Sequence, residues 1–458
     1  MRFSRRSFLG GALSFGAFAG SRAFAGSRAF AVPAGFFSPS HAKLVLGVVS
    51  DIHVDTGRGD FRKFGDTAQF EKTLRWFDAQ GVDGVVVAGD MADNGMVNQL
   101  ECVGEAWFRV FPEGRSTLDG REIAQLFVYG NHDCEGYAYD KFDVRYFDKE
   151  SFDAGKICRD PAGAWERVFH EDYAPIWLKE VKGYQFVGAH WKFGKDSWDG
   201  IPAVEDWFRE NADRIDRRKP FFFIQHCHPQ GTVYGDEAWA PDKGYSTRAL
   251  SAFPNAVAFS GHSHESLTDE RSIWQGAFTS IATSSLRYGG RVDRYAQRQG
   301  LLVSVYDERI VVARRDFLRD ASLGEDWVIP LPAAIAKPYS FKGRRERAFP
   351  PQFAPGARVE VVREKDGWLL TIPAANAGST RAFRYEIATA LADDAKKPVL
   401  FRTYAAKYNL PRSEATVPTK YFVKDASLPK GADGRPLAPT FTVTPLDCFD
   451  NRGLSIGS

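Results

Sequence analysis

The sequence predicts a layered α/β domain followed by an all-β domain, and the change of pattern along the chain carries this prediction. From Leu44 to about Phe317, apolar runs of strand length alternate with amphipathic helical stretches. Beyond about residue 357 the helical periodicity disappears, and apolar residues alternate with polar ones in period two. A proline-rich stretch separates the two regions, so we expect two domains joined by a linker.

Five apolar runs in the first region end directly in residues that can act as acids, bases or metal ligands. They are Leu44 to Ser50 before Asp51-Ile52-His53, Val85 to Ala88 before Gly89-Asp90, Ile123 to Tyr129 before Gly130-Asn131-His132-Asp133, Phe221 to Gln225 before His226, and Ala256 to Ser260 before Gly261-His262-Ser263-His264. Buried strands that stop at polar residues bring them to the carboxyl edge of a sheet. An isolated Asp-x-His carries little information, whereas five such strand ends favour one shared site over ordinary polar turns.

Helices are expected between these strands. Thr67 to Gln80 has apolar residues at helical spacing, and Gly81 ends it before the next strand, which completes a β-α-β unit. Val204 to Ile215 is a second amphipathic helix and precedes the strand at Phe221. Two closing strands, Leu301 to Tyr306 and Ile310 to Arg315, flank a polar turn.

An aromatic-rich stretch between about residues 135 and 180 follows the motif Gly130-Asn131-His132-Asp133. Its aromatic residues are Tyr137, Tyr139, Phe142, Tyr146, Phe147, Tyr173 and Trp177. Because it departs from a strand that ends in the site, it could cover the site and contact substrate. The alternative is that these aromatic residues form a small core of their own.

The second region is predicted to be a β-sandwich. Pro330, Pro332 and Pro338, together with Phe-Pro-Pro-Gln-Phe-Ala-Pro-Gly at 349–356, mark a linker over 326–356. The alternating pairs beyond it are Val359/Val361, Leu370/Ile372, Phe383/Tyr385/Ile387, Val399/Phe401 and Phe441/Val443. Their layout over 357–458 loosely resembles fibronectin type III-like modules. We expect a structural or docking role there, with carbohydrate or surface binding as the alternative.

Residues 1–31 have the features of an export signal. Arginines at 2, 5 and 6 precede the apolar stretch Phe8 to Ala19. Ser4-Arg5-Arg6-Ser7-Phe8-Leu9 resembles a twin-arginine leader, which implies the twin-arginine export machinery of a bacterium, although an ordinary secretory signal is the alternative. A tandem hexapeptide offers cleavage after Ala25 or Ala31, and 32–43 would form the mature N-terminal segment. We therefore expect a periplasmic or secreted protein.

Charge and composition exclude several classes of protein. Cleavage after Ala25 removes four arginines and no acidic residue, which changes the formal net charge from +2 to −2 and argues against a nucleic-acid binder. No later stretch has the roughly eighteen apolar residues of a transmembrane span, so none is expected in the mature chain. Five cysteines, irregularly spaced, fit neither a disulfide scaffold nor a zinc ribbon.

The strand-end residues predict a centre with two metal ions. The ligand set is Asp51, His53, Asp90, Asn131, His226, His262 and His264. Mixed nitrogen and oxygen donors suit Mn, Fe or Zn, and seven are too many for a single ion with an open position. A carboxylate can bridge such a pair, and the pair both activates water and neutralises a transferring phosphoryl group.

These motifs together resemble the calcineurin-like metallophosphoesterases. The resemblance rests on Asp51-x-His53, Gly89-Asp90-x-x-Asp93-x-Gly95, Gly130-Asn131-His132-Asp133, His226 and Gly261-His262-x-His264, and covers about 44–317 of a catalytic domain expected over 44–325. It implies a layered β-sandwich flanked by helices. It also implies that Asp51, His53 and His264 hold one metal, that Asn131, His226 and His262 hold the other, and that Asp90 bridges them.

The resemblance also implies a catalytic pair, in which His132 protonates the leaving oxygen or stabilises its charge and Asp93 orients His132. Purple acid phosphatases resemble this set but have a tyrosine in place of Asp93 and lack the histidine at His53. His228 competes with His226 for one ligand position, and the sequence favours His226. His190, after the strand Tyr184 to Ala189, could reach the site or serve the framework.

The function predicted is that of an exported dinuclear metallophosphoesterase. It would hydrolyse a phosphodiester or phosphomonoester through attack of a metal-bound hydroxide, with the diester preferred because periplasmic diesters are plentiful. The alternative is a cell-surface or carbohydrate-binding protein whose phosphoesterase domain is vestigial. The seven ligands and His132 are all retained, and this argues against the alternative.

Overall fold

The computed structural model describes residues 41–55, 67–136, 158, 160–192, 201, 203–290, 297–333, 335–391, 399–428, 430 and 439–458. The chain has two compact units, Met1–Ser38 and Pro39–Ser458, and all described residues belong to the second. The expected leader at 1–31, the segment 32–40 and the aromatic residues at 137–147 lie outside the described residues.

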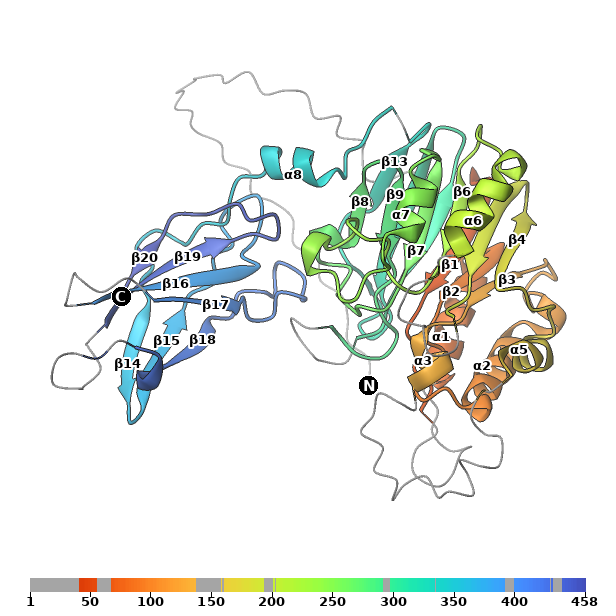
Figure 1. Ribbon diagram of the computed structural model, residues 1–458. Coiled ribbons are helices and arrows are strands. Elements are labelled where there is room, and N and C mark those ends of the chain that lie inside the picture. Colours follow the sequence, from red (N-terminus) through yellow and green to blue (C-terminus); the bar gives the residue numbers. More distant parts are fainter. Residues whose placement is uncertain are drawn as a thin grey trace, which may run out of the picture. The chain divides into compact units, whose positions relative to one another are not determined.

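The first sheet contains the strands that precede Asp51, Asp90 and Asn131. Three parallel strands, β1 (Leu44–Val49), β2 (Gly84–Ala88) and β3 (Ala124–Val128), lie side by side (Figure 1). They adjoin the antiparallel β10 (Gln299–Val305) and β11 (Arg309–Asp316) in the order β11-β10-β1-β2-β3. Both β12 (Ala321–Ser322) and β13 (Trp327–Pro330) pair with β11. The sheet therefore extends beyond residue 326, where the sequence indicated a linker.

The second sheet carries the remaining predicted ligands. Its strands are β4 (Ile176–Val181), β5 (Tyr184–Ala189), β6 (Phe221–Ile224), β7 (Ala256–Ser260), β9 (Thr279–Ala282) and β8 (Ile273–Gln275), in that spatial order. The four inner strands β5, β6, β7 and β9 are parallel, so the carboxyl ends of β6 and β7 lie at one edge.

The apolar strands are buried on both faces, which is why they read as continuous apolar runs. In β1, Leu44, Leu46 and Val48 face a core shared with Phe222, Ile224 and Phe259 of the second sheet. The alternate residues Val45 and Val49 face a separate core that contains helical residues. The two sheets thus pack against each other, and each is covered by helices on its outer face.

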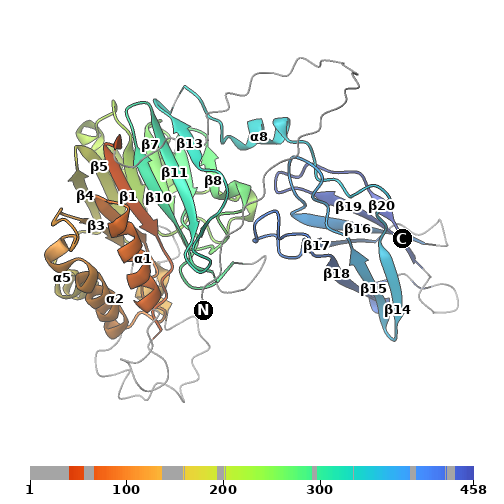
Figure 2. The same ribbon diagram turned by 180° about the vertical axis from the view of Figure 1, so that it is seen from behind.

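The helices form the outer layers. On the first sheet lie α1 (Thr67–Ala79), α2 (Val97–Val110) and α5 (Pro161–Phe169) (Figure 2). Their Phe70, Trp107 and Trp165 are buried in the core that this side of the sheet shares. On the second sheet lie α6 (Ala203–Glu210) and α7 (Tyr245–Leu250), whose Phe208 and Leu250 join a third core. The helix α2 was not among the helices expected from sequence, although its Leu100, Val103, Trp107 and Val110 have helical spacing. The predicted α/β layers, with sheets flanked by helices, are confirmed.

Shorter helices complete this part of the chain. They are α3 (Asn131–Glu135), α8 (Phe341–Arg347) and the single turns Pro112–Gly114, Ala212–Arg214, Gly235–Glu237, Glu270–Ser272 and Asp425–Ser427. Among the described residues, no helix combines the length and the apolar character needed to cross a membrane.

The C-terminal region is all β, as expected. One antiparallel sheet contains β14 (Glu360–Glu364), β15 (Gly367–Ile372) and β18 (Thr419–Lys424). The other contains β17 (Leu400–Tyr404), β16 (Arg384–Leu391), β19 (Pro439–Leu446) and β20 (Ile456–Gly457). Leu370 and Val423 of the first share an apolar cluster with Ile387 and Val443 of the second.

Candidate metal centre

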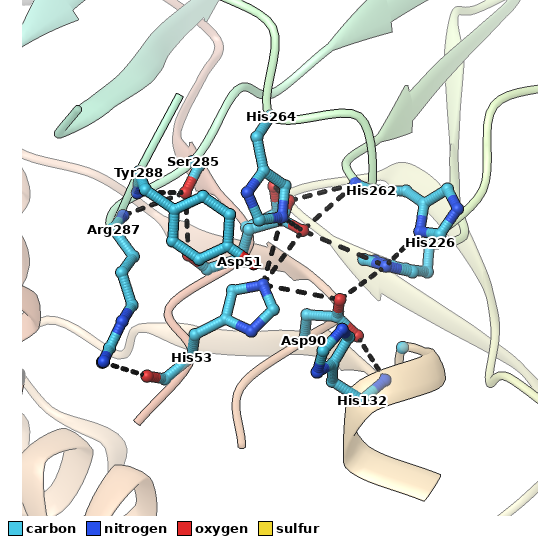
Figure 3. A network of polar contacts seen from close by, with 12 residues as sticks. Asp51, His53, Asp90, His132, His226, His262, His264, Ser285, Arg287 and Tyr288 are labelled. Carbon is cyan, nitrogen blue, oxygen red and sulfur yellow. Dashed lines mark hydrogen bonds and ion pairs between the residues drawn. The ribbon is translucent and has the colours of Figure 1, made fainter. Parts of the chain in front are cut away.

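The seven predicted ligands are buried where strands of both sheets end. Asp51 and His53 follow β1, Asp90 follows β2 and Asn131 opens α3 after β3. From the second sheet, His226 follows β6, and His262 and His264 follow β7. Figure 3 shows Asp51, His53, Asp90, His226, His262 and His264 turned toward one another. Residues up to about two hundred positions apart in sequence thus share one buried cluster.

The backbone at these strand ends is unusual. Five of the seven ligands have a positive φ: Asp51 (52°), His53 (47°), Asp90 (55°), His262 (72°) and His264 (54°). Residues other than glycine rarely occupy this left-handed region, which costs roughly 1–3 kcal/mol per residue and occurs mainly at functional sites. The loops after β1, β2 and β7 therefore leave the strand conformation within a few residues of the strand end.

The glycines in the motifs are required by close packing around the ligands. A Cβ atom on Gly130 would overlap the carboxylate of Asp90, and one on Gly261 would overlap the carboxylate of Asp51. Both glycines are thus fixed by ligands that come from other strands. This explains why Gly precedes Asn131 and His262 in the two motifs.

One group of ligand atoms surrounds Asp51. The Asp51 Oδ1 atom lies 2.8 Å from Nε2 of His264 and 3.8 Å from Nε2 of His53, and the two imidazole nitrogens are 3.1 Å apart. Burial opposes ionisation of Asp51, but the neighbouring histidines outweigh this effect and hold its pKa well below the usual range. Asp51 is therefore an ionised carboxylate, and it faces two imidazole nitrogens.

A second group surrounds Asp90. Its Oδ2 atom lies 3.0 Å from Nε2 of His226 and 3.6 Å from Nε2 of His53, so Asp90 reaches both groups. Nδ1 of His262 is 3.2 Å from Nε2 of His226. Burial would lower the pKa of His226, but the Asp90 carboxylate raises it to about 9. The same histidine holds the pKa of Asp90 below its usual range against the effect of burial. Protons thus supply the positive charge that these carboxylates attract.

These residues fit a pair of metal ions. Asp51, His53, Asp90 and His264 have ligand atoms within 4.8 Å of one another, as do Asp90, His226 and His262, and Asp90 belongs to both groups. The buried Oδ1 atom of Asn131 and Nδ1 atom of His264 have no hydrogen-bond partner among the described residues. A buried acceptor without a donor is costly, and a cation beside the Asn131 oxygen would remove that cost. The cluster therefore resembles a dimetal site with mixed nitrogen and oxygen donors.

His132 lies beside the cluster and is half-buried. Its backbone N–H donates to Asp90 Oδ1 at 2.8 Å, and its ring is 4.6 Å from that of His53. Its Nδ1 atom lies 2.7 Å from the backbone carbonyl oxygen of Asp93. The Asp93 carboxylate is 3.0 Å from Nδ1 of His53 instead. The expected orienting role of Asp93 thus takes a different form, because its main chain holds His132 and its side chain holds His53.

Asp133, the last residue of the motif Gly130-Asn131-His132-Asp133, connects two of the ligand-bearing loops. Asp133 accepts hydrogen bonds from the backbone N–H groups of Ala92 (2.6 Å) and Gly130 (2.7 Å). Burial and the nearby Asp90 carboxylate raise the pKa of Asp133 to about 7. The side chain joins the loops after β2 and β3, and so fixes Asp90 relative to Asn131.

Two further histidines lie outside the cluster. Both ring nitrogens of His228 are 2.8 Å from serine hydroxyls, those of Ser260 and Ser263, so this side chain supports the loop that carries His262. His190 accepts a hydrogen bond from the backbone N–H of Tyr129 and packs among aromatic rings. Burial lowers the pKa of each to about 3. The structure thus places His226 with the ligands and His228 behind them.

Sequence reasoning missed two aromatic residues next to the cluster. The ring of Tyr288 is 4.4 Å from that of His264, and the ring of Trp191 is 6.4 Å from that of His226. No motif marks either residue. The only available signal was the position of Tyr288 beside Arg287 and before Gly289-Gly290, in a loop downstream of the ligand motif.

Comparisons with known proteins find one family for the first domain. Residues 44–266 match the family model described as calcineurin-like phosphoesterase. Among solved structures, the chain is similar to a dimetal phosphatase from Danio rerio, with 12% identity over 63% of this chain and 99% of that one and a TM-score of 0.37. It is also similar to a purple acid phosphatase from yellow lupin (Lupinus luteus) seeds, with 13% identity over 64% and 55% and a TM-score of 0.41. No curated protein matches the chain.

Proposed function

We propose that the calcineurin-like metallophosphoesterase domain of this chain is an active enzyme that hydrolyses a phosphate ester. The observation that carries the proposal is the pair of buried ligand groups that share Asp90. Asp51, His53 and His264 would hold one metal ion, Asn131, His226 and His262 the other, and Asp90 both. When bound, two such ions supply positive charge for the phosphoryl oxygens and activate water for attack on phosphorus.

His132 is the group that we assign to the leaving oxygen. Its Nδ1–H donates a hydrogen bond to the Asp93 carbonyl oxygen, which fixes the orientation of the ring. A proton carried on Nε2 can then pass to the alkoxide as the P–O bond breaks. The half-buried position of His132 beside Asp90 lets it contact a substrate that the fully buried ligands cannot reach.

We also propose which metals are bound, which ester is cleaved and where the protein is located. The mixed donors support Mn, Fe or Zn. A phosphodiester is the preferred substrate and a phosphomonoester the alternative. The leader-like residues 4–9 support export by the twin-arginine route to the periplasm or beyond.

The test measures initial rates of the purified protein with Mn²⁺ on bis(para-nitrophenyl) phosphate and on para-nitrophenyl phosphate. We expect cleavage of at least one ester and a loss of at least about 100-fold in Asn131→Ala, which lacks the amide oxygen. Asn255→Ala, which removes an asparagine that bonds the backbone of Asp216, is the matched control and should retain full activity. Calorimetry with Mn²⁺ counts the bound ions. Two bound ions without cleavage of either ester would contradict the proposal, and the ratio of the two rates decides the preferred ester.

A further inference from the structure

Tyr288 lies at the open border of the ligand cluster. Its ring centroid is 4.4 Å from that of His264 and 5.4 Å from that of His53, and 40% of the residue is exposed. Figure 3 shows the ring beside both histidines. His53 and His264 belong to the same ligand group, around Asp51. An aromatic face is therefore exposed directly next to one half of the proposed dimetal site.

The loop that carries Tyr288 is tied to the ligand-bearing backbone. The Ser285 hydroxyl donates to the Asp51 carbonyl at 3.1 Å and accepts from the backbone N–H of Tyr288 at 3.3 Å. The Arg287 guanidinium donates to the carbonyl oxygen of His53 at 2.5 Å. Since these bonds join the loop to the backbone of Asp51 and His53, they position the main chain of Tyr288 next to the cluster.

Trp191 provides an internal comparison on the other half of the site. Its ring is 6.4 Å from His226 and 6.5 Å from His262, but only 4% of the residue is exposed. Its indole N–H donates to Glu135 Oε1 at 3.2 Å. Trp191 is thus a buried side chain whose polar atom already has a partner within the protein. Of these two aromatic side chains, Tyr288 is the one that a bound molecule can contact.

We infer that Tyr288 is a specificity-determining residue, whose ring packs against a flat, unsaturated group on the alcohol part of the phosphate ester. The inference rests on the proposed function for the position of the phosphoryl group. An ester held by its phosphoryl group among buried ligands must direct its alcohol part toward the exposed border, where Tyr288 lies. Aromatic pairs in such positions stack or meet edge to face, so an aryl or heteroaromatic ester gains a contact that a small alkyl ester lacks.

The test uses two phosphonates that cannot be hydrolysed, because their carbon–phosphorus bond replaces the ester bond. Phenylphosphonate and methylphosphonate are titrated by calorimetry into the Mn²⁺-loaded protein. We expect phenylphosphonate to bind about threefold to tenfold more tightly than methylphosphonate. Tyr288→Ala should abolish this preference, whereas Tyr288→Phe, which keeps the ring and removes the hydroxyl, should retain it.

The matched control is Tyr404→Ala. Tyr404 lies on β17 in the C-terminal region with 38% of its surface exposed, and its loss should leave the preference unchanged. A phenyl preference that persists in Tyr288→Ala, or that disappears in Tyr288→Phe, would show that the ring is not its source and would overturn the inference. The inference is equally overturned if wild type shows no preference for the phenyl group, or binds neither compound. If the preference exists but no ester is cleaved, the inference stands and the proposed hydrolysis fails.

Discussion

Asp90 in the α/β domain and Asp447 in the turn after β19 are both buried, but their neighbours differ in kind. Asp447 accepts hydrogen bonds from the Thr380 hydroxyl (2.9 Å), the backbone N–H groups of Phe449 (2.8 Å) and Asn451 (2.9 Å), and the Asn451 side chain (3.0 Å). These neutral donors satisfy both oxygens. Asp90 instead faces imidazole nitrogens of His226 and His53.

The comparison teaches that burial of a charge does not by itself indicate function. A carboxylate surrounded by neutral donors stabilises a turn, because its hydrogen bonds replace those lost to water. A carboxylate surrounded by histidines needs positive charge, which either protons or metal ions can provide. Asp447 thus belongs to the framework of its region, and Asp90 to a site that accepts cations.

The strongest test of this difference is Asp90→Asn, which keeps the size of the side chain and removes its charge. We expect phosphoesterase activity to fall by at least about 100-fold, because the carboxylate shared by both ligand groups is lost. The measurement is kcat/KM together with calorimetric titration of Mn²⁺. If the variant binds two ions and turns over normally, Asp90 is no different from Asp447.

The converse variant is Asp447→Ala. It leaves several buried donors without an acceptor, and we expect a loss of about 3 kcal/mol in the free energy of unfolding. The activity of the folded fraction should be unchanged. Urea unfolding followed by fluorescence, with rates measured below the transition, checks both statements. Asp447→Asn retains one oxygen and should lose less stability than Asp447→Ala. If Asp447→Ala lost much of its activity without losing stability, the distinction between Asp447 and Asp90 would be wrong.

The raised pKa of His226 in the metal-free cluster predicts that the stability of the fold decreases at alkaline pH. The folded-state pKa of His226, about 9, exceeds the unfolded value of about 6.5. Its stabilising contribution, up to about 3 kcal/mol, is therefore fully present below pH 6.5 and disappears as the pH rises through about 9. We measure the melting temperatures of metal-free wild type and His226→Gln from pH 6 to pH 10 in roughly unit steps. The two curves should converge as the pH rises. Parallel curves would show that His226 does not hold an additional proton in the metal-free fold.

The smallest expected effect concerns His228, a buried histidine of the framework. Its folded-state pKa, about 3, lies below the unfolded value, so unfolding takes up a proton as the pH falls below about 6.5. At pH 5 this costs the wild type about 2 kcal/mol relative to neutral pH. His228→Gln should flatten the acid side of the stability profile, measured by urea unfolding. An unchanged acid slope would mean that this imidazole is protonated within the fold.

Much of this arrangement could be predicted from sequence, because apolar runs and the residues that end them are local patterns. The strands before Asp51, Asp90, Asn131, His226 and His262 were all expected. The structure brings Asp51, Asp90, His226 and His262 together in two ligand groups that share Asp90. In the C-terminal region β18 was not among the expected pairs, because Tyr421 and Phe422 are adjacent and obscure its alternation.

The partners of individual side chains could not be predicted. The Asp93 carboxylate lies next to His53 rather than His132, and this depends on how two loops from different strands fold over each other. The loop that carries Tyr288 is joined to the cluster by hydrogen bonds from Ser285 to Asp51 and from Arg287 to His53, both more than two hundred residues earlier in the chain. Neither relation leaves a spacing or periodicity in the sequence.

The left-handed backbone of the ligands has a consequence for protein engineering. The φ angle of a residue sets the direction in which its side chain leaves the main chain, so Asp51, His53, Asp90, His262 and His264 point where they do because of their backbone. Placing the same side chains on regular strand ends of another scaffold would aim them elsewhere. A designer who wishes to transplant this centre has to copy whole loops, with their dihedral angles, and cannot succeed by exchanging residues alone.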